Sequence, residues 1–305
     1  MNWPSVGVVI PTRDRPALLR RAVQAVLSQE YAGPLRVIVV YDGTPPDTTL
    51  ARDGCRPVLV ARNTRTPGLA GARNTGILAL DTDLVAFCDD DDVWLPGKLA
   101  AQVTALLEHD AELVTCAIEV QFEDRLTPRL AGTDTIRLPH LLRSRMVMLH
   151  SSTFVIRRPL LTSEDTGIGL VAEDAPGSQN EDWDLLLRAA KRRPITHVDQ
   201  PLVRVLWGRT SLFAHRYDTK IESLTWMLKR HPEIGRCRHG AARVYGQLAC
   251  WHAAKGDRWN AAKWAGRALR TRWREPRAAI ALAAATGMIN VESVLTALHR
   301  RGHGI

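Results

Sequence analysis

Four consecutive aspartates, Asp89 to Asp92, follow the short apolar run at residues 84–88. Carboxylates this close repel one another, so their pKa values would rise or the turn would open unless a cation compensated the charge. A hard divalent cation with a preference for oxygen ligands, such as Mn²⁺ or Mg²⁺, is the simplest compensation. The alternative is a solvated acidic loop, since many charged runs are exposed. We therefore expect a divalent-metal site at this turn.

A second acidic turn, Asp42-Gly43-Thr44, follows the apolar run at residues 35–40. Asp42 is suited to accept hydrogen bonds from a base N–H or from ribose hydroxyls. The alternative is an Asx-turn that only stabilises the loop. Both acidic turns come at the ends of predicted strands, and open α/β sheets bind their ligands at the carboxyl ends of strands. The pattern favours a nucleotide between the two turns, with the metal neutralising its diphosphate.

Three more acids, Glu181, Asp182 and Asp184, follow the loop at residues 175–179, which is rich in Gly, Pro and Ser. Helical spacing follows them, so this segment predicts a loop that enters a helix. Acids in a first helical turn interact favourably with the helix dipole, and a plain capping role is one interpretation. A carboxylate held at a helix start is also suited to act as a general base on an acceptor hydroxyl.

Strand-like and helix-like segments alternate along the first two thirds of the chain. Four apolar runs predict buried strands: residues 6–10, 35–40, 58–60 and 84–88. Apolar residues at helical spacing over residues 16–28 and near residues 72–80 predict helices between them. Such alternation is typical of an α/β fold with a doubly wound, mostly parallel sheet. No G-x-G-x-x-G loop follows the first strand and the chain has no G-x-x-x-x-G-K-[ST] segment, which disfavours dinucleotide redox chemistry and P-loop hydrolysis.

The C-terminal third differs in composition. The whole chain has a net charge of +9, and most of the excess positive charge lies in this third. The segment 214–305 contains 17 Lys and Arg but only 6 Asp and Glu. Apolar residues at helical spacing over 241–254 and 260–272 predict a helix hairpin. A basic surface here could meet an anionic membrane face or a phosphorylated acceptor, or it could simply be solvated. No recognition motif for nucleic acid is present, so we expect no nucleic-acid partner.

Cysteine usage and hydropathy indicate a compartment. The five cysteines form no C-x-x-C pair and are odd in number, which favours neither a disulfide framework nor a zinc site. No secretory signal is visible at the N-terminus. The longest apolar stretch, at residues 278–289, is shorter than the roughly 20 residues of a membrane span. We expect a cytoplasmic protein, and peripheral contact with the inner face of the membrane through the basic C-terminal region stays open.

Taken together, these motifs carry a family resemblance. Over about residues 5–212 the chain resembles the inverting family-2 glycosyltransferases with the GT-A fold. The matching segments are residues 8–15 for the first strand and loop, 41–44 for the "VDDGS" turn, 71–76 for the "ARN-G" segment, 87–99 for the DXD region and 181–188 for the "ED" motif. Their order and spacing make chance a poor explanation.

The resemblance implies roles for residues of this chain. It implies that Asp42 contacts the nucleotide base and that Asp182 is the catalytic base. It implies a Mn²⁺ or Mg²⁺ ion on Asp89 and Asp91. Further contacts with the nucleotide-sugar are expected from Pro11, Thr12, Arg13, Arg73, Asp89 and Asp90. Acceptor contacts are expected from His150, Glu181 and Trp183.

The chain departs from the family pattern in two places. Tyr41 stands where the "VDDGS" turn has its first acid, which removes one carboxylate from the base pocket. Many relatives have a histidine after the helix of the catalytic base, where this chain has Leu206-Trp207-Gly208-Arg209. Because a guanidinium suits bidentate phosphate contacts, we expect Arg209 to contact the diphosphate in its place.

The expected reaction is transfer of a sugar from a UDP-, GDP- or dTDP-linked donor to an acceptor hydroxyl. Asp182 would take the acceptor proton, and a single displacement at the anomeric carbon would invert its configuration. A glycan, a lipid-linked molecule or a small molecule could each be the acceptor. We expect a catalytic domain over residues 1–212, with a nucleotide-binding half at 1–100 and an acceptor half at 101–212, and a helical region at 213–305.

Two other function classes remain open from the sequence. A nucleotidyltransferase also pairs metal-binding carboxylates with an α/β sheet, but usually begins with a Gly-rich basic loop that residues 11–15 do not provide. A non-catalytic module that binds a nucleotide-sugar or a partner would tolerate the loss of Asp182. If Asp182→Asn abolishes sugar transfer but leaves metal-dependent nucleotide binding intact, the non-catalytic module is excluded.

Overall fold

The computed structural model describes residues 3–207, 216–289, 291 and 294. Contacts between residues divide the chain into two compact units. The first comprises residues 1–138, 146–174 and 181–206, and the second comprises residues 139–145, 175–180 and 207–305. The expected domain boundary after residue 212 stays a prediction.

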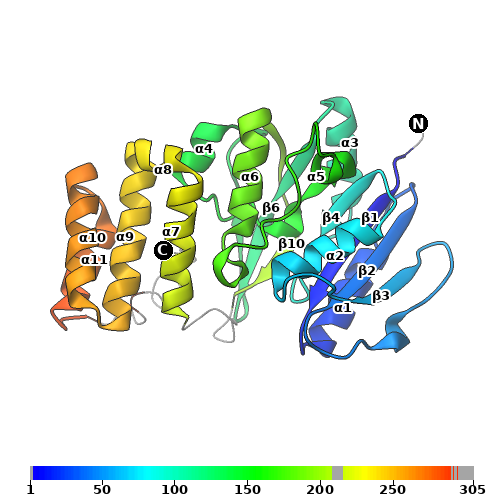
Figure 1. The fold of residues 1–305 in the computed structure, drawn as a ribbon. Coiled ribbons are helices and arrows are strands. Elements are labelled where there is room, and N and C mark those ends of the chain that lie inside the picture. Colours follow the sequence, from blue (N-terminus) through cyan, green and yellow to red (C-terminus); the bar gives the residue numbers. More distant parts are fainter. Residues whose placement is uncertain (1–2, 208–215, 290, 292–293, 295–305) are drawn as a thin grey trace. The chain divides into compact units, whose positions relative to one another are not determined.

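The N-terminal half of the sheet is parallel (Figure 1). Its strands are β1 (Val6–Thr12), β2 (Leu35–Tyr41), β3 (Val58–Arg62) and β4 (Leu84–Phe87), in the spatial order β3-β2-β1-β4. Every residue of β1 and β4 is buried, as expected for parallel strands covered on both faces. Helix α1 (Pro16–Leu27) leads from β1 to β2, and α2 (Leu69–Ala79) leads from β3 to β4. These crossovers run in opposite directions across the sheet, so right-handed connections put the two helices on opposite faces.

The rest of the sheet is mixed. Strand β9 (Val155–Arg157) pairs antiparallel with both β4 and β6 (Leu113–Phe122), and β10 (Ile195–Leu206) pairs parallel with β6. Three short strands complete it: β5 (Val93–Trp94), β7 (Arg125–Arg129) and β8 (Thr135–Ile136). The remaining helices of this unit are α3 (Lys98–Glu108), α5 (Arg158–Thr162), α6 (Glu181–Arg192) and the short 3₁₀ turns η1 (Thr48–Leu50) and η2 (Ser151–Thr153). The predicted α/β class with a mostly parallel sheet is confirmed.

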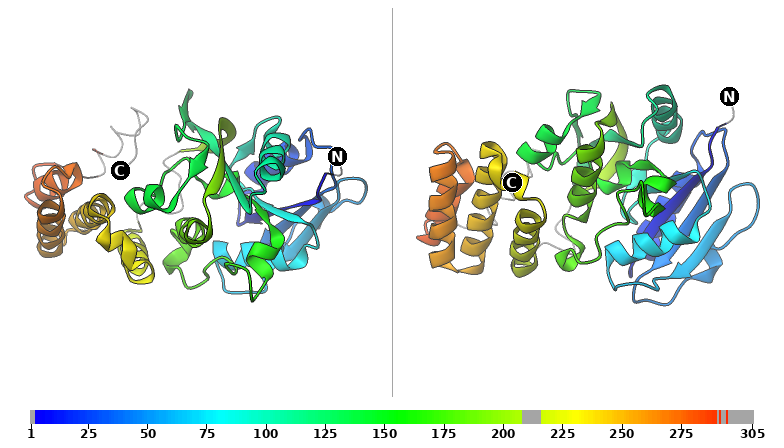
Figure 2. Two further views of the ribbon diagram at one scale, coloured as in Figure 1. Left: turned by 90° about the horizontal axis from the view of Figure 1, so that it is seen from above. Right: turned by 45° about the horizontal axis from the view of Figure 1, so that its top comes forward.

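The second unit is helical. Besides most of α4 (Leu138–Arg143) and the 3₁₀ turn η3 (Pro176–Ser178), it contains α7 (Tyr217–Arg230), α8 (Pro232–Arg236), α9 (Arg238–Lys255), α10 (Arg258–Thr271) and α11 (Pro276–Ala285). The yellow-to-orange helices α9, α10 and α11 pack side by side (Figure 2). Gly256, at φ 86°, ends α9 in the left-handed conformation, and the side chain of Asp257 then caps α10 by accepting from the backbone N–H of Asn260. The predicted helix hairpin is confirmed.

Small residues let these helices approach closely. The core between α9, α10 and α11 contains Ala241, Ala249, Ala265, Ala268 and Ala278, with Tyr245 filling the remaining space. Among the described residues, no helix is both long and apolar enough to cross a membrane.

Candidate active site

The four aspartates form a tight turn between β4 and β5. The backbone N–H of Asp92 donates to the carbonyl of Asp89 at 3.1 Å, which closes the turn. Buried strand β4 ends at Phe87, so the sheet delivers all four carboxylates to the carboxyl end of a central strand. Cationic side chains of the protein, Arg73, Arg15 and His150, lie against the four carboxylates. They supply part of the compensating charge that the sequence led us to expect from a metal.

Asp89 is held by a buried arginine. Nη2 of Arg73 donates to Asp89 Oδ1 at 2.6 Å, and Ser151 Oγ donates to Asp89 Oδ2 at 3.1 Å. Burial alone would raise the pKa of Asp89, but the positive charges of Arg73 and His150 together lower it. Asp89 is therefore an ionised carboxylate fixed in one orientation.

Asp90 and Asp91 share a second arginine. Nη1 of Arg15 lies 2.5 Å from Asp91 Oδ2 and 3.2 Å from Asp90 Oδ1, and Thr12 Oγ1 donates to Asp90 Oδ2 at 2.7 Å. Burial raises the pKa of Asp90. Burial together with the charges of Asp92 and Asp89 raises the pKa of Asp91 to about 6. One arginine therefore does not fully compensate the charge of the turn.

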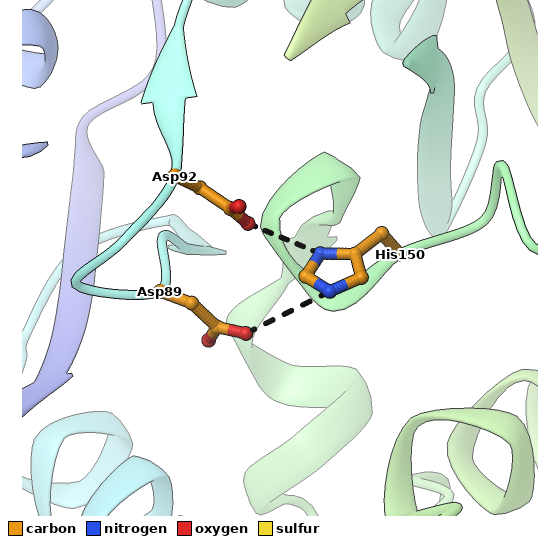
Figure 3. Close-up of side chains that lie close together, drawn as sticks. All are labelled: Asp89, Asp92 and His150. Atoms are coloured by element: carbon orange, nitrogen blue, oxygen red, sulfur yellow. Dashed lines mark ion pairs between the residues drawn. The ribbon is translucent and has the colours of Figure 1, made fainter. Parts of the chain in front are cut away.

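Asp92 faces His150, which comes from the segment before η2 (Figure 3). His150 Nδ1 lies 3.2 Å from Asp92 Oδ2, and His150 Nε2 lies 4.0 Å from Asp89 Oδ2. Burial would lower the pKa of this imidazole, but the charges of Asp92, Asp89 and Asp182 raise it to about 9. One ligand atom from each of Asp89, Asp92 and His150 lies within 4.8 Å of the others, close enough for a metal ion to bridge them.

This donor set fits a divalent cation but differs from the predicted one. Carboxylate oxygens suit Mg²⁺ and Mn²⁺, and an imidazole suits several transition metals once its proton is displaced. Asp89 belongs to both the predicted pair and the geometric group. Asp91, the other member of the predicted pair, is ion-paired with Arg15. His150, which we expected to contact the acceptor, lies against Asp92 of the acidic turn.

Ser152 ties the turn to η2. Its Oγ accepts from the backbone N–H of Asp89 at 2.9 Å and donates to Asp92 Oδ2 at 2.5 Å. The indole N–H of Trp94 donates to the carbonyl of Ser152 at 3.0 Å. A single buried hydroxyl therefore sets the relative positions of the first and last carboxylates of the turn.

The second predicted acid, Asp42, is almost fully buried beside the end of β1. Its backbone N–H donates to the carbonyl of Thr12 at 3.0 Å. Its Oδ1 accepts from Asn63 Nδ2 at 2.8 Å and from the backbone N–H of Gly68 at 3.0 Å. These contacts orient the carboxylate toward the loop between β3 and α2. Asp42 Oδ1 therefore bonds to residues distant in the sequence and not to the next residues of an Asx-turn.

A further acid, Glu173, was missed by the sequence reasoning. It accepts from Asn74 Nδ2 at 2.7 Å, from the backbone N–H of Thr66 at 3.3 Å and from the guanidinium of Arg65. Burial opposes its ionisation, but the hydrogen bonds from Arg65, Asn74 and Thr66 together outweigh it and lower its pKa to about 2. No local sequence pattern identifies Glu173, because its partners are about 100 residues away.

Helix α2 can deliver Arg73 because it packs very closely. A Cβ atom at Gly76 would lie 2.4 Å from Val9 Cγ1, and one at Gly71 would lie 1.9 Å from the carbonyl of Thr66. Only glycine fits these positions, so α2 is drawn onto β1 and onto its own preceding loop. Arg73 and Asn74 thereby reach the acidic turn and Glu173 respectively.

The third acidic motif begins α6 and is linked to the turn through Arg73. Nη1 of Arg73 donates to Glu181 Oε1 at 2.5 Å. Oδ1 of the neighbouring Asp182, 5% exposed, accepts from the backbone N–H of Trp183 at 2.7 Å. The charge of Asp182 contributes to the raised pKa of His150, so these two side chains lie within electrostatic reach.

The comparisons with known proteins decide the family. The model described as Glycosyl transferase family 2 matches residues 7–162, about half of the chain. The chain belongs to glycosyltransferase family 2. The match includes all of β1 except Val6, and also Asp42, Arg73, the aspartate turn and His150.

Curated relatives of this family-2 member share parts of its chain. The succinoglycan biosynthesis protein ExoW of Rhizobium meliloti is 29% identical over 193 residues, which cover 55% of this chain and 60% of that protein. A GalNAc(5)-diNAcBac-PP-undecaprenol β-1,3-glucosyltransferase of Campylobacter jejuni is 30% identical over 135 residues, 42% of this chain and 43% of that protein. The chain thus spans about half the length of these relatives.

Solved structures show that the fold of this family-2 chain is GT-A. Staphylococcus aureus TarS 1–349 in complex with UDP-GlcNAc superposes with a TM-score of 0.60 at 14% identity, covering 98% of this chain and 92% of that one. The mannosyltransferase PcManGT from Pyrobaculum calidifontis, in complex with GDP-Man and Mn²⁺, gives 0.55 at 17% identity, covering 98% and 80%. The predicted GT-A fold is confirmed.

The other predicted site residues of this family-2 chain differ in their exposure to solvent. Pro11 and Thr12 end β1 and are buried, whereas Arg13 is exposed immediately after it. Trp183 is buried on α6, and Glu181 beside it is paired with Arg73. Arg209 lies outside the described residues. Direct contacts of these side chains with donor or acceptor stay predictions.

Proposed function

We propose that this chain is a metal-dependent, inverting glycosyltransferase that moves a sugar from a nucleoside-diphosphate donor to an acceptor hydroxyl. The observation that carries the proposal is the double ion pair of Arg73. It holds Asp89 of the metal-type turn and Glu181, the neighbour of Asp182, on one guanidinium. The two acidic motifs of the family are therefore joined in one site rather than scattered over the surface.

Asp182 is the proposed catalytic base. It stands at the start of α6, where the helix dipole and the backbone N–H of Trp183 favour its ionised form. An ionised carboxylate can take the proton of an acceptor hydroxyl as its oxygen attacks the anomeric carbon. A single attack from the face opposite the leaving diphosphate inverts the configuration at that carbon.

The aspartate turn is the proposed metal and diphosphate site. Asp89 and Asp91 are the ligands that the family resemblance implies, and the geometry supports Asp92 and His150 as additional ones. A bound Mn²⁺ or Mg²⁺ would supply Lewis-acid stabilisation of the charge on the leaving diphosphate. Arg15 would have to release Asp91 before that carboxylate could bind a cation. Arg209 remains a proposed contact of the diphosphate.

Asp42 is the proposed base-recognition residue. It is held by Asn63 and Gly68 at the end of β2, on the same edge of the sheet as the aspartate turn after β4. Both strands pair parallel with β1, whose Pro11, Thr12 and following Arg13 would lie between base and phosphates. We keep residues 1–100 as the nucleotide-binding half and 101–212 as the acceptor half of the catalytic domain, with 213–305 as the helical region.

The proposed acceptor is a lipid-linked glycan. Two relatives have names that describe transfer to diphosphoundecaprenol-linked sugars. Those names support a lipid-linked acceptor over a free small molecule, and they support a place for this chain at the cytoplasmic face of a membrane. His150, Glu181 and Trp183 remain the candidate acceptor residues.

Isothermal titration tests the donor half of the proposal. The purified chain is titrated with UDP, GDP, CDP and dTDP, each with Mn²⁺ and again with EDTA. We expect metal-dependent binding of one diphosphate, and loss of that binding in Asp42→Asn but not in the exposed control Asp53→Asn. Binding of none of the four nucleotides, or equal binding in EDTA, would contradict the proposed function.

A further inference from the structure

Helix α10 and the residues after it have an unusual composition. Residues 258–274 hold six Lys and Arg, three Trp and no Asp or Glu. One side of α10 packs against α9 and α11 through alanines that are fully buried, Ala261, Ala265 and Ala268. The small side chains let α10 lie close to its neighbours, and Trp264 and Leu269 of α10 also pack against this core.

The outward side of α10 carries exposed indoles and cations. Trp259 is 80% exposed and Trp273 is 68% exposed. Lys263 and Arg270 lie between them and are exposed. At about 100° per residue, positions 259, 263 and 270 fall within an arc of roughly 40° on the helix. Trp273 follows two residues after the helix ends, about 20 Å along its axis from Trp259.

We call Trp259, Lys263, Arg270 and Trp273 the α10 stripe. Two further arginines add positive charge near it. The guanidinium of Arg274 lies 4.3 Å from the ring centroid of Trp273, and that of Arg267 lies 4.7 Å from that of Tyr245. Both side chains thus lie against aromatic rings. A large exposed indole is costly in water, and two of them with exposed cations between them in the sequence indicate a surface that is covered by a partner.

The chemistry of this face selects the partner. Tryptophan favours the boundary between headgroups and acyl chains, and lysine and arginine are attracted to anionic headgroups. A helix with both on one side lies flat on a bilayer surface. Single-stranded nucleic acid also combines stacking with cations, but proteins bind it in grooves or on strand platforms. The α10 stripe is instead the convex face of a single helix.

We propose that Trp259, Lys263, Arg270 and Trp273 form a docking surface for an anionic phospholipid bilayer. The biological role of this surface rests on the proposed function, because membrane attachment would bring the enzyme to a lipid-linked acceptor. Binding to the bilayer does not itself require catalysis. It concerns peripheral attachment through the headgroup region, with the two indoles inserted and the two cations paired with lipid phosphates.

Vesicle sedimentation tests this surface. The full chain is mixed with vesicles of phosphatidylcholine alone or with about 30% phosphatidylglycerol added, a content that gives a negative surface potential. We expect binding to the anionic vesicles only, and its loss at high salt because the attraction is screened. Lys263→Glu with Arg270→Glu should lower the partition coefficient about tenfold or more, since each cation contributes about fivefold.

A matched pair of variants separates the stripe from overall charge. Lys229→Glu with Arg236→Glu makes the same charge change at exposed positions of α7 and α8. We expect this control to retain most of the vesicle binding. An equal loss in both pairs would mean that net charge alone is responsible, and would overturn the inference.

The indoles give an independent readout. Trp259→Ala with Trp273→Ala should weaken vesicle binding and remove most of the fluorescence blue shift that vesicles cause. Because both residues are exposed, thermal unfolding should be unchanged. Binding to single-stranded RNA without binding to vesicles, or an unchanged blue shift, would overturn the proposal. Nucleotide titration of the same variants separates failure of this inference from failure of the proposed function. The proposed function requires metal-dependent nucleotide binding in these variants, whether or not they bind vesicles.

Discussion

Arg73 Nη1 lies 2.5 Å from Glu181 Oε1, which joins α2 to α6 across 108 residues of sequence. The same guanidinium holds Asp89 at 2.6 Å and is 1% exposed. Burial alone would lower the pKa of Arg73, but the charges of Asp89 and Glu181 raise it above its usual range. Arg73 is therefore a permanently charged bridge between the metal-type turn and the helix that carries the proposed base.

Replacing Arg73 should destabilise the fold, because Asp89 and Glu181 both lose their counter-ion. Arg73→Met leaves two buried carboxylates without their counter-ion, and breaking a buried pair in this way costs about 3–5 kcal/mol of the free energy of unfolding. Chemical denaturation measures the loss. The control is Arg36→Met, which breaks an exposed pair with Asp81 and should change stability by no more than about 0.5 kcal/mol.

Arg73→Lys sharpens this test. Lysine keeps the charge but cannot hold two carboxylates with a planar fork, so we expect an intermediate loss of stability and a lower rate of sugar transfer. A fully stable Arg73→Met variant would contradict the bridging role.

Ser152 should control the affinity of the aspartate turn for metal. Ser152→Ala removes the hydroxyl that fixes both Asp89 and Asp92, and outer-shell changes of this kind typically cost about 10- to 100-fold in metal affinity. Mn²⁺ titration of the chain measures this loss. Ser28→Ala, which loses an exposed hydrogen bond on α1, is the matched control. Equal Mn²⁺ affinities in the two variants would show that Ser152 does not position the ligands.

Glu173 should make stability depend on pH in the acid range. Its pKa is about 2 in the folded state and has an ordinary value near 4.5 when unfolded. The folded state thus favours the ionised form, so the stabilisation is complete above about pH 4.5 and disappears as the pH falls through about 2. We expect Glu173→Gln to lower the free energy of unfolding by about 1 kcal/mol at pH 7.

The difference between the two proteins should shrink steadily as denaturation is repeated at lower pH. A difference that stays constant from pH 7 to pH 2 would assign the effect to lost packing instead of lost charge. Glu164→Gln, at an exposed position on the same loop, should show no such pH dependence.

The acidic turns were predictable because they follow recognisable strands. Asp42 follows β2 and Asp89 follows β4, and both strands pair parallel with β1, so strand pattern alone predicts a common edge. The α/β alternation and the helix hairpin were likewise local signals. Short segments with a clear period of hydrophobicity give such information directly.

The partners of these acids were not predictable in the same way. Arg15 and Asn63 contact these acids, and Glu173 contacts Asn74, through pairings that depend on how loops close over the sheet. The antiparallel strand β9, inserted between β4 and β6, brings η2 and His150 to the aspartate turn. A three-residue strand has no reliable sequence signature, so the position of His150 beside the turn could not be predicted.

Sugar transfer by Asp182→Asn tests the central claim most directly. The donor identified by titration is incubated with wild type and variant, and released nucleoside diphosphate and glycosylated acceptor are both quantified. We expect the rate to fall by about 10²- to 10⁴-fold, with metal-dependent binding of the nucleotide unchanged. Transfer at the wild-type rate in Asp182→Asn would contradict the account and would move the catalytic base to another residue of the site.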